Sequence, residues 1–272
     1  MTLDSKRNVA IIAHVDHGKT TLVDQLFRQT GMFRTNEQVE ERLMDNLDLE
    51  RERGITIRSK NGSLRYEGHT VNIIDTPGHA DFGGQVERVL QMADGALLLV
   101  DAQEGPMPQT TFVLTKALAL ALPVVVVINK IDKPAARPHW AVDQVFDLLA
   151  SMDAPDTILD FPTVYASARD GVASTDPDRP GRDMRPILDA ILRHIPPPSG
   201  SQDGAFQLQV ATIDYSSFLG RLGVGKITGG RVRTNEAVVL AGEGHALHPA
   251  RITKIYRFER DRKVETDTAE TG

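Results

Sequence analysis

The segment of residues 13–20, Ala-His-Val-Asp-His-Gly-Lys-Thr, has residue types that could bind phosphate. It lies between an apolar run typical of a strand and a run typical of a helix, where a glycine turn presents backbone N–H groups and the positive helix end. Lys19 is predicted to reach the β- and γ-phosphates of a nucleotide, and Thr20 to place its hydroxyl on Mg²⁺. The pattern departs from G-x-x-x-x-G-K-[ST] at Ala13, so alone it could be an accidental turn. The predicted phosphate contacts are His14, Val15, Asp16, His17, Gly18, Lys19, Thr20, Thr21 and Gly78.

A second motif, Asp75-Thr-Pro-Gly-His79, ends an apolar run at residues 71–74. It sets a carboxylate and a glycine turn beside the phosphate loop, where a γ-phosphate can be sensed. A hydroxyl from the loop Arg53-Gly54-Ile55-Thr56 could add a ligand that is ordered only while a γ-phosphate is present. The predicted magnesium ligands are Thr20, Thr56 and Asp75.

Two further motifs indicate which base is read. Asn129-Lys130-Ile131-Asp132 ends a later strand, and the Asp132 carboxylate can accept hydrogen bonds from N1–H and the 2-amino group of guanine, an edge that adenine lacks. Ser167-Ala168 follows the next strand and offers a backbone N–H to guanine O6. Because the motifs fall in order at successive strand ends, where ligands bind α/β sheets, we expect one guanine-nucleotide site. The predicted guanine contacts are Asn129, Lys130, Asp132, Ser167 and Ala168.

The elements that must position these motifs alternate between strand and helix. Continuous apolar runs such as GALLLVD and PVVVVIN are typical of strands covered on both faces, so we predict a doubly wound, mostly parallel sheet of the P-loop NTPase class. Strands are expected at Asn8–Ala13, Val71–Asp75, Ala96–Asp101, Val124–Asn129 and Thr163–Ala166. Helices are expected at Lys19–Thr30, Phe82–Met92, Gln109–Leu120, Ala141–Ser151 and Met184–His194, with Val142, Val145, Phe146 and Leu149 packing inward.

Pro196-Pro197-Pro198, followed by Ser-Gly-Ser-Gln-Asp-Gly, cannot continue a helix or a strand. We therefore expect residues 1–198 to form the nucleotide-binding domain and residues 199–272 a smaller antiparallel β-barrel. Alternation at Phe206, Leu208 and Val210 and a run at Ala237–Leu240 favour strands there. About 74 residues is short for a closed barrel, and residues 266–272 look like the approach to a strand that does not form, so truncation is expected.

Composition narrows the class of protein. A net charge of −6 does not suit a protein that coats itself in nucleic acid, so no DNA partner is expected. A mixed charged cluster from Arg251 to Lys263 admits either a ribosomal RNA contact or a solvated strand face. Without cysteine, a membrane-length apolar run or a signal peptide, a monomer in the cytoplasm is expected. The His and Asp side chains near the phosphate loop could suggest zinc, but a cation there would compete with Mg²⁺ and nucleotide.

Taken together, AHVDHGKT, DLERERGITI, DTPGH, NKID and SA resemble the translational GTPases, the family of EF-G, EF-Tu, LepA and BipA/TypA. Longer phrases, such as NIIDTPGHADFGGQVERVLQMADGALLLVDAQEGPMPQT and DYSSFLGRLGVGKITGG, resemble the BipA/TypA group over essentially the whole chain. The resemblance implies a ribosome-associated GTPase that converts GTP to GDP and phosphate in translation, ribosome assembly or stress response, with further domains after the barrel.

The resemblance also implies residue roles. His79 would be catalytic, by orienting the attacking water rather than by abstracting a proton; Val15 and Ile55 would form an apolar gate; and Asp16 would help to hold a monovalent cation. No arginine is an evident finger, so the intrinsic rate is expected on the order of 10⁻⁴ to 10⁻² per second. Three alternatives stay open: a GTP-dependent binding module with incidental hydrolysis, another translational GTPase such as LepA or EF-G, and an ATP-dependent transferase.

Overall fold

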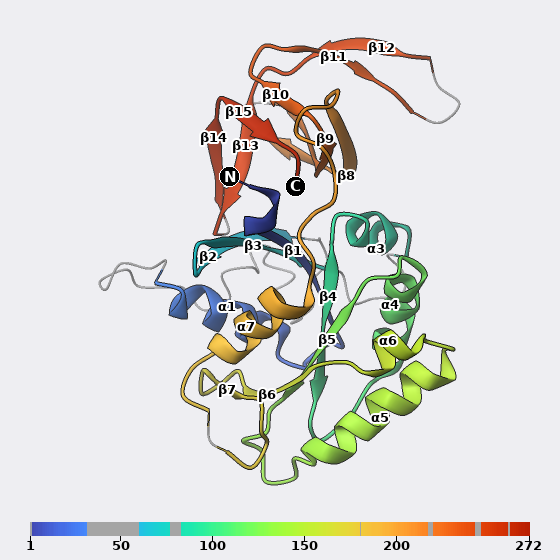
Figure 1. Cartoon of the computed structure of the whole chain (residues 1–272), viewed down its shortest axis with the longest axis vertical. Coiled ribbons are helices and arrows are strands. Elements are labelled where there is room, and N and C mark those ends of the chain that lie inside the picture. Colours follow the sequence, from blue (N-terminus) through green and yellow to red (C-terminus); the bar gives the residue numbers. More distant parts are fainter. Residues whose placement is uncertain are drawn as a thin grey trace.

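A seven-stranded, mostly parallel sheet is the centre of the fold (Figure 1). The computed structural model describes residues 2–31, 60–76, 83–179, 181–216, 220–242, 246–260 and 262–272. In spatial order the strands are β2 (Lys60–Tyr66), β3 (His69–Asp75), β1 (Lys6–Ala13), β4 (Gly95–Asp101), β5 (Val124–Asn129), β6 (Thr163–Ser167) and β7 (Val172–Ser174). Neighbours pair in parallel from β3 to β6, whereas β2 and β7 pair antiparallel at the two edges.

Helices cover both faces of this sheet. One face packs against α1 (Lys19–Gln29) and α7 (Arg185–His194). The other packs against α3 (Gly83–Leu90), α4 (Pro108–Ala119), α5 (Pro138–Ser151) and α6 (Asp156–Leu159). A short 3-10 turn, η1 (Leu3–Ser5), precedes β1. The prediction of a doubly wound sheet is therefore confirmed.

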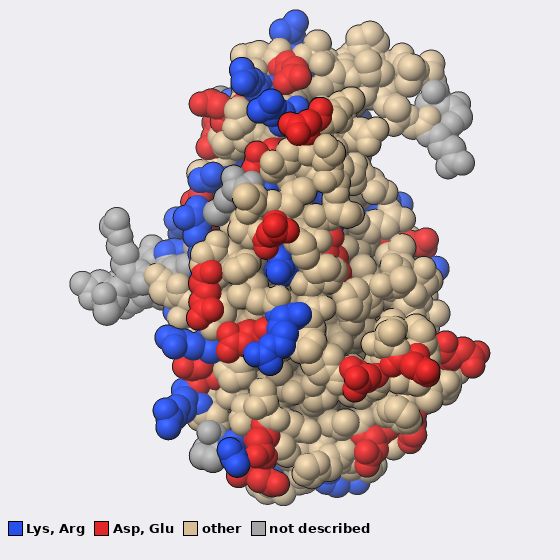
Figure 2. Space-filling model, viewed as in Figure 1, with Lys and Arg blue, Asp and Glu red and all other residues tan. Residues whose placement is uncertain are grey.

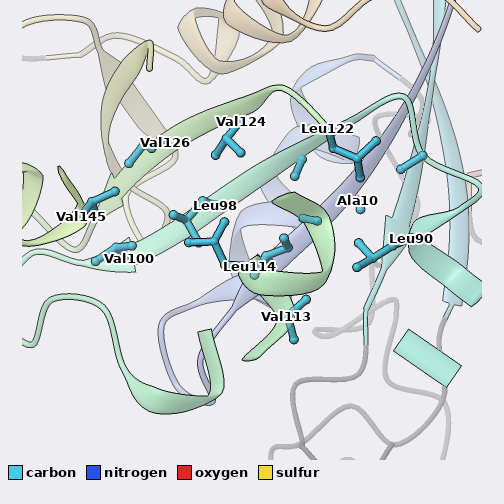
Figure 3. Close-up of a cluster of buried hydrophobic side chains, with 14 of the residues drawn as sticks. Ala10, Leu90, Leu98, Val100, Val113, Leu114, Leu122, Val124, Val126 and Val145 are labelled. Atoms are coloured by element: carbon cyan, nitrogen blue, oxygen red, sulfur yellow. The ribbon is translucent and has the colours of Figure 1, made fainter. Parts of the chain in front are cut away.

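Burial on both faces explains the continuous apolar runs in the sequence. Every residue of β1, β4 and β5 is buried. Figure 3 shows one of the two resulting clusters, where Leu98 and Val126 from neighbouring strands meet Leu114 of α4 and Val145 of α5. A strand in this position meets no water on either side, so alternation of polar and apolar residues is not required.

The order of the strands places a crevice for ligands. From β1 the chain passes through α1 to β2 and β3 on one side, and later reaches β4 on the other side of β1. The loop after β1 thus lies at the point where the strand order reverses, which is where open α/β sheets bind ligands.

After α7 the described residues pair in antiparallel ladders, near the top of Figure 1. The pairs are β8 (Gln207–Ser216) with β9 (Gly220–Gly229), β10 (Arg231–Arg233) with β15 (Thr268–Glu270), β11 (Ala237–Leu240) with β12 (His248–Arg251), and β13 (Ile255–Glu259) with β14 (Arg262–Thr266). The expectation that no strand forms within residues 266–272 was wrong, because residues 268–270 pair with β10. The boundary between residues 198 and 199 stays a prediction.

Polar contacts join the antiparallel ladders to the sheet. The Lys226 ammonium on β9 pairs with the Asp94 carboxylate at 2.5 Å, and both side chains are nearly buried. The Asn8 amide on β1 donates to the same carboxylate at 2.7 Å. At the start of β1, two residues before Asn8, Lys6 donates to the carbonyl oxygen of Thr271 at 2.8 Å, which brings the two ends of the chain together.

Some expected details differ in the structure. Strand β2 was not predicted, because KNGSLRY has little apolar alternation and gains its conformation from pairing with β3. Phe146 was expected in the core, yet it is 46% exposed on the outer side of α5. The expected helix start at Phe82 lies outside the described residues.

Charge is uneven over the surface. Figure 2 shows acidic side chains gathered over α5 and α6, and both signs mixed over the opposite edge and the antiparallel ladders. The exposed acidic residues of the α5 and α6 region are Asp143, Asp147, Asp153, Asp156 and Asp160. Within the described residues, no helix has the length and apolarity that crossing a bilayer takes.

Candidate nucleotide-binding site

The loop between β1 and α1 has the backbone geometry of a tight glycine turn. Asp16 and Gly18 have φ angles of 63° and 93°, in the left-handed region. Leu22 N–H donates to the Gly18 carbonyl oxygen at 2.9 Å, which starts the helical hydrogen bonding directly after the loop. A Cβ on Gly18 would lie 2.5 Å from the Asn129 amide nitrogen. Glycine is therefore required here both by φ and by space.

Lys19 joins this loop to the end of β3. Its ammonium donates to the Thr76 carbonyl oxygen at 2.9 Å and pairs with the Asp75 carboxylate at 2.6 Å. Both side chains are largely buried, at 12% and 5% exposed. The Thr76 hydroxyl donates in turn to the Ile11 carbonyl oxygen of β1 at 2.6 Å. A cation and a carboxylate predicted to contact phosphate and metal thus lie side by side at the carboxyl ends of β1 and β3.

Asn129 links the loop to the segment after β6. Its amide donates to the His17 carbonyl oxygen at 2.8 Å, and its own oxygen accepts from Ala168 N–H at 3.0 Å. Asn129 is buried, so both bonds are shielded from water. Three motifs that are far apart in the sequence are therefore held together by one side chain.

Lys130 makes a second link, through Asp101 at the end of β4. Its ammonium donates to the Asp16 carbonyl oxygen in the loop and pairs with the buried Asp101 carboxylate at 2.8 Å. Asp101 also accepts from Lys133 at 3.1 Å and from Gln103 N–H at 2.7 Å. Burial alone would raise the pKa of Asp101, but these donors outweigh it and lower the pKa to about 2. Asp101 is thus a fixed negative charge beneath the loop.

His17 is fully buried behind the loop. Its Nδ1 lies 3.3 Å from the Asp101 backbone nitrogen and 3.4 Å from the Leu99 carbonyl oxygen, and its Nε2 lies 3.4 Å from the Glu104 carboxylate. Burial lowers the pKa of His17 below its usual value. The His14 ring packs edge-on against it at 5.2 Å. Across the described residues no group of three or more His, Asp or Glu side chains is arranged to hold a metal ion.

Asp132, predicted to read the base, lies beside the segment that follows β6. Its carboxylate is 14% exposed and pairs with Arg169 Nη1 at 3.2 Å. Arg169 also donates from Nε to Asp170 at 2.9 Å, and the Ser167 hydroxyl donates to Asp170 at 2.8 Å. The side of the site expected to face guanine therefore has a small charged cluster, in which Arg169 is 73% exposed and Asp132 is largely covered.

The residues also fit a magnesium ion by their chemistry. Asp75 supplies a nearly buried carboxylate at the end of β3. Thr20 is the second residue of α1, directly after the phosphate loop. Mg²⁺ takes hard oxygen ligands, and next to a nucleotide it needs only one or two from the protein. Thr56, the third predicted ligand, lies outside the described residues.

The structure brings most of the predicted site residues to one edge of the sheet. From the phosphate loop to the segment after β6, these are His14, Val15, Asp16, His17, Gly18, Lys19, Thr20, Thr21, Asp75, Asn129, Lys130, Asp132, Ser167 and Ala168. Ile55, Thr56, Gly78 and His79 lie outside the described residues. Asp101 and Arg169 were not among the site residues predicted from the sequence. Asp101 could have been found, because it ends an apolar strand at the ligand edge as Asp75 does.

Several curated proteins that are similar to this chain in sequence share one name. The Large ribosomal subunit assembly factor BipA of Escherichia coli K12 is 50% identical over 270 residues, which are 99% of this chain and 44% of that protein. The proteins of the same name in Synechocystis and Bacillus subtilis are 53% and 51% identical over 266 residues. The chain thus spans less than half the length of the curated relatives it matches.

A protein of Thermus thermophilus, known from a crystal structure, has the same fold. It superposes with a TM-score of 0.72 at 20% identity, over 99% of this chain and 51% of that one. The sequence pattern of the family described as Elongation factor Tu GTP binding domain matches residues 4–197, which include every described residue of the site. This chain therefore belongs to the family of elongation factor Tu GTP-binding domains.

Proposed function

We propose that this chain binds GTP at the carboxyl edge of its sheet and hydrolyses it to GDP and phosphate as a ribosome-associated conformational switch. It acts in the cytoplasm as a monomer, in translation, ribosome assembly or stress response.

The run of hydrogen bonds through Asn129 is the observation that carries it. This side chain ties the His17 carbonyl of the phosphate loop to the Ala168 N–H of the segment expected to face guanine. A base reader and a phosphate cradle held at a fixed separation suit one nucleotide lying across both. Adenine lacks the donor edge that the Asp132 carboxylate would read, so the arrangement favours GTP over ATP.

At the phosphate end, Lys19 would neutralise the β- and γ-phosphates. Thr20 and Asp75 would hold Mg²⁺, which offsets charge developing on the phosphate oxygens during transfer. Asp16 is exposed at the tip of the loop, and we infer that its carboxylate helps to hold a monovalent cation there. Replacing K⁺ by a bulky organic cation should then slow turnover without unfolding the protein.

The ribosome is proposed as the partner because the relatives at about half identity are named as assembly factors of its large subunit. Those proteins are more than twice as long as this chain, so the strength of docking by these 272 residues is part of what must be tested.

The test is single-turnover hydrolysis of GTP with and without large ribosomal subunits, on this chain and on a version extended to the length of its relatives. We expect an intrinsic rate on the order of 10⁻⁴ to 10⁻² per second and a clear rise with subunits. A His79→Ala variant should keep its GTP dissociation constant within a few fold, but lose about 10²- to 10⁴-fold of the stimulated rate.

A small effect of His79→Ala is expected without ribosomes, because the gate of Val15 and Ile55 would hold the histidine away from the water. Equal rates for parent and variant in the presence of subunits would reject His79 as the catalytic residue. Equal rates of the parent with and without subunits would favour a GTP-dependent binding switch whose hydrolysis is incidental.

A further inference from the structure

We propose that Arg169 is a specificity-determining residue, which competes with the base for the Asp132 carboxylate and so weakens guanine binding selectively. The inference rests on the proposed function, because it takes Asp132 as the reader of guanine. Arg169 lies outside the predicted motifs, and its proposed effect is to weaken the binding of guanine nucleotides.

The first observation is the position of the guanidinium. Arg169 Nη1 lies 3.2 Å from Asp132 Oδ2, and no other ion pair to Asp132 occurs among the described residues. Arg169 follows directly after Ala168, the residue predicted to face guanine O6, whose N–H donates to the Asn129 side-chain oxygen at 3.0 Å in this structure. The cation therefore lies beside the Asp132 carboxylate, which the edge of a base would approach.

The second observation is that Arg169 is held in this direction. Its Nε and Nη2 donate to the two oxygens of Asp170 at 2.9 and 3.2 Å. Asp170 is itself fixed by the Ser167 hydroxyl, which donates to Oδ2 at 2.8 Å. This two-pronged pairing leaves Nη1 free to point at Asp132, so little side-chain entropy opposes the contact.

Competition follows from the number of oxygens that each base needs. Guanine presents N1–H and a 2-amino group, so full recognition takes both oxygens of Asp132. Arg169 uses one of them. Hypoxanthine lacks the 2-amino group and needs a single oxygen, so an inosine nucleotide can bind while Arg169 stays on Oδ2. Arg169 therefore weakens the binding of GDP but not of IDP, which reduces the preference of the site for GDP over IDP.

The expected size is small, because Arg169 is 73% exposed. An ion pair open to solvent changes an equilibrium by roughly two- to five-fold. Salt screens such a pair, so the effect must shrink as ionic strength rises, with a Debye length of about 30 Å at 0.01 M and about 3 Å at 1 M. Selectivity and salt dependence together distinguish competition from a general loss of structure.

The experiment measures dissociation constants of GDP and IDP by calorimetry, at low and high salt, for the parent chain, Arg169→Ala and Arg169→Gln. Arg179→Ala is the matched control, because Arg179 is 81% exposed and pairs with Asp176 at 3.1 Å in the same way, without touching Asp132. Thermal melts confirm that each variant is folded.

We expect both Arg169 variants to bind GDP about two- to five-fold more tightly at low salt and IDP unchanged, with the difference lost at high salt. Arg179→Ala should match the parent throughout. Weaker GDP binding would overturn the proposal and would mean that the guanidinium supports the base from its face. Unchanged GDP binding, or an equal gain for IDP, would also overturn it.

The experiment distinguishes failure of this inference from failure of the proposed function. If the folded parent binds no guanine nucleotide, the proposed function falls and this inference falls with it. If the parent binds GDP and the Arg169 variants do not differ from it, only the role of Arg169 is rejected.

Discussion

The two ends of the site use ion pairs of opposite character. At the phosphate end, Lys19 and Asp75 pair with 12% and 5% of their side chains exposed. At the base end, Arg169 and Asp132 pair with 73% and 14% exposed. Breaking a buried pair leaves a charge without solvent, whereas an exposed pair exchanges readily with water. The phosphate end is thus built to hold charge in place, and the base end to exchange one partner for another.

Removing Lys19 should produce the largest effect. Lys19→Ala is expected to weaken GTP binding by about 4 kcal/mol, or roughly 1,000-fold, because the counter-charge to the phosphates is lost in a buried setting. Thr20→Ala should act in the same direction through Mg²⁺. Lys116→Ala, at an exposed pair with Glu87, is the control. A calorimetric titration of Lys19→Ala that matched the parent would reject the phosphate-loop assignment.

Gly18→Ala tests the link between the two ends. We expect a loss of about 2 to 3 kcal/mol in the free energy of unfolding, from the positive φ and from contact with Asn129. Gly68→Ala has a φ of 77° with nothing within 4 Å, so it isolates the backbone strain. Chemical denaturation measures both. Equal losses would mean that the contact between Gly18 and Asn129 is unimportant.

Asp101→Asn should have the next largest effect. It is expected to lower the free energy of unfolding by about 2 kcal/mol at pH 7. The folded pKa of Asp101 is lowered from 3.8 to about 2, so its carboxylate adds stability above pH 3.8, and this contribution is lost as the pH falls through about 2. The difference in unfolding free energy between parent and variant should therefore close between these pH values.

The control for this pH series is Glu265→Gln, which removes an exposed carboxylate paired with Lys254 at 2.9 Å. It should change stability by well under about 1 kcal/mol at any pH. A difference between parent and Asp101→Asn that persisted at pH 2 would show that the buried charge of Asp101 does not stabilise the fold.

Much of the sheet could be predicted because its central strands have no solvent face. Continuous apolar runs such as GALLLVD and PVVVVIN predict buried strands from their residue types alone. Strands β2 and β15 were missed because their residues become strands by pairing with β3 and β10, which are contacts between elements rather than local preferences. Phe146 was wrongly predicted to be buried. It lies at the edge of the apolar face of α5, and helical spacing alone does not tell whether a residue at that edge is buried or exposed.

The site was predictable to the extent that its residues end parallel strands. Their partners were not, since which cation meets which carboxylate depends on side-chain directions that a motif does not contain. Lys130 was expected to support the base, and the structure adds its contacts with Asp101 and the loop. The roles of Thr56, Ile55, Gly78 and His79 stay predictions.

Asp132→Asn is the most direct test of whether Asp132 reads guanine. An amide puts a donor where guanine also donates, but xanthine presents an oxygen there, so the preference for GTP over XTP should reverse by roughly 10- to 100-fold. Calorimetric titration of parent and variant with GTP, XTP and ATP measures it. The parent should prefer GTP and the variant XTP, while neither protein binds ATP well. An unchanged ratio of GTP to XTP affinity would show that Asp132 does not read guanine.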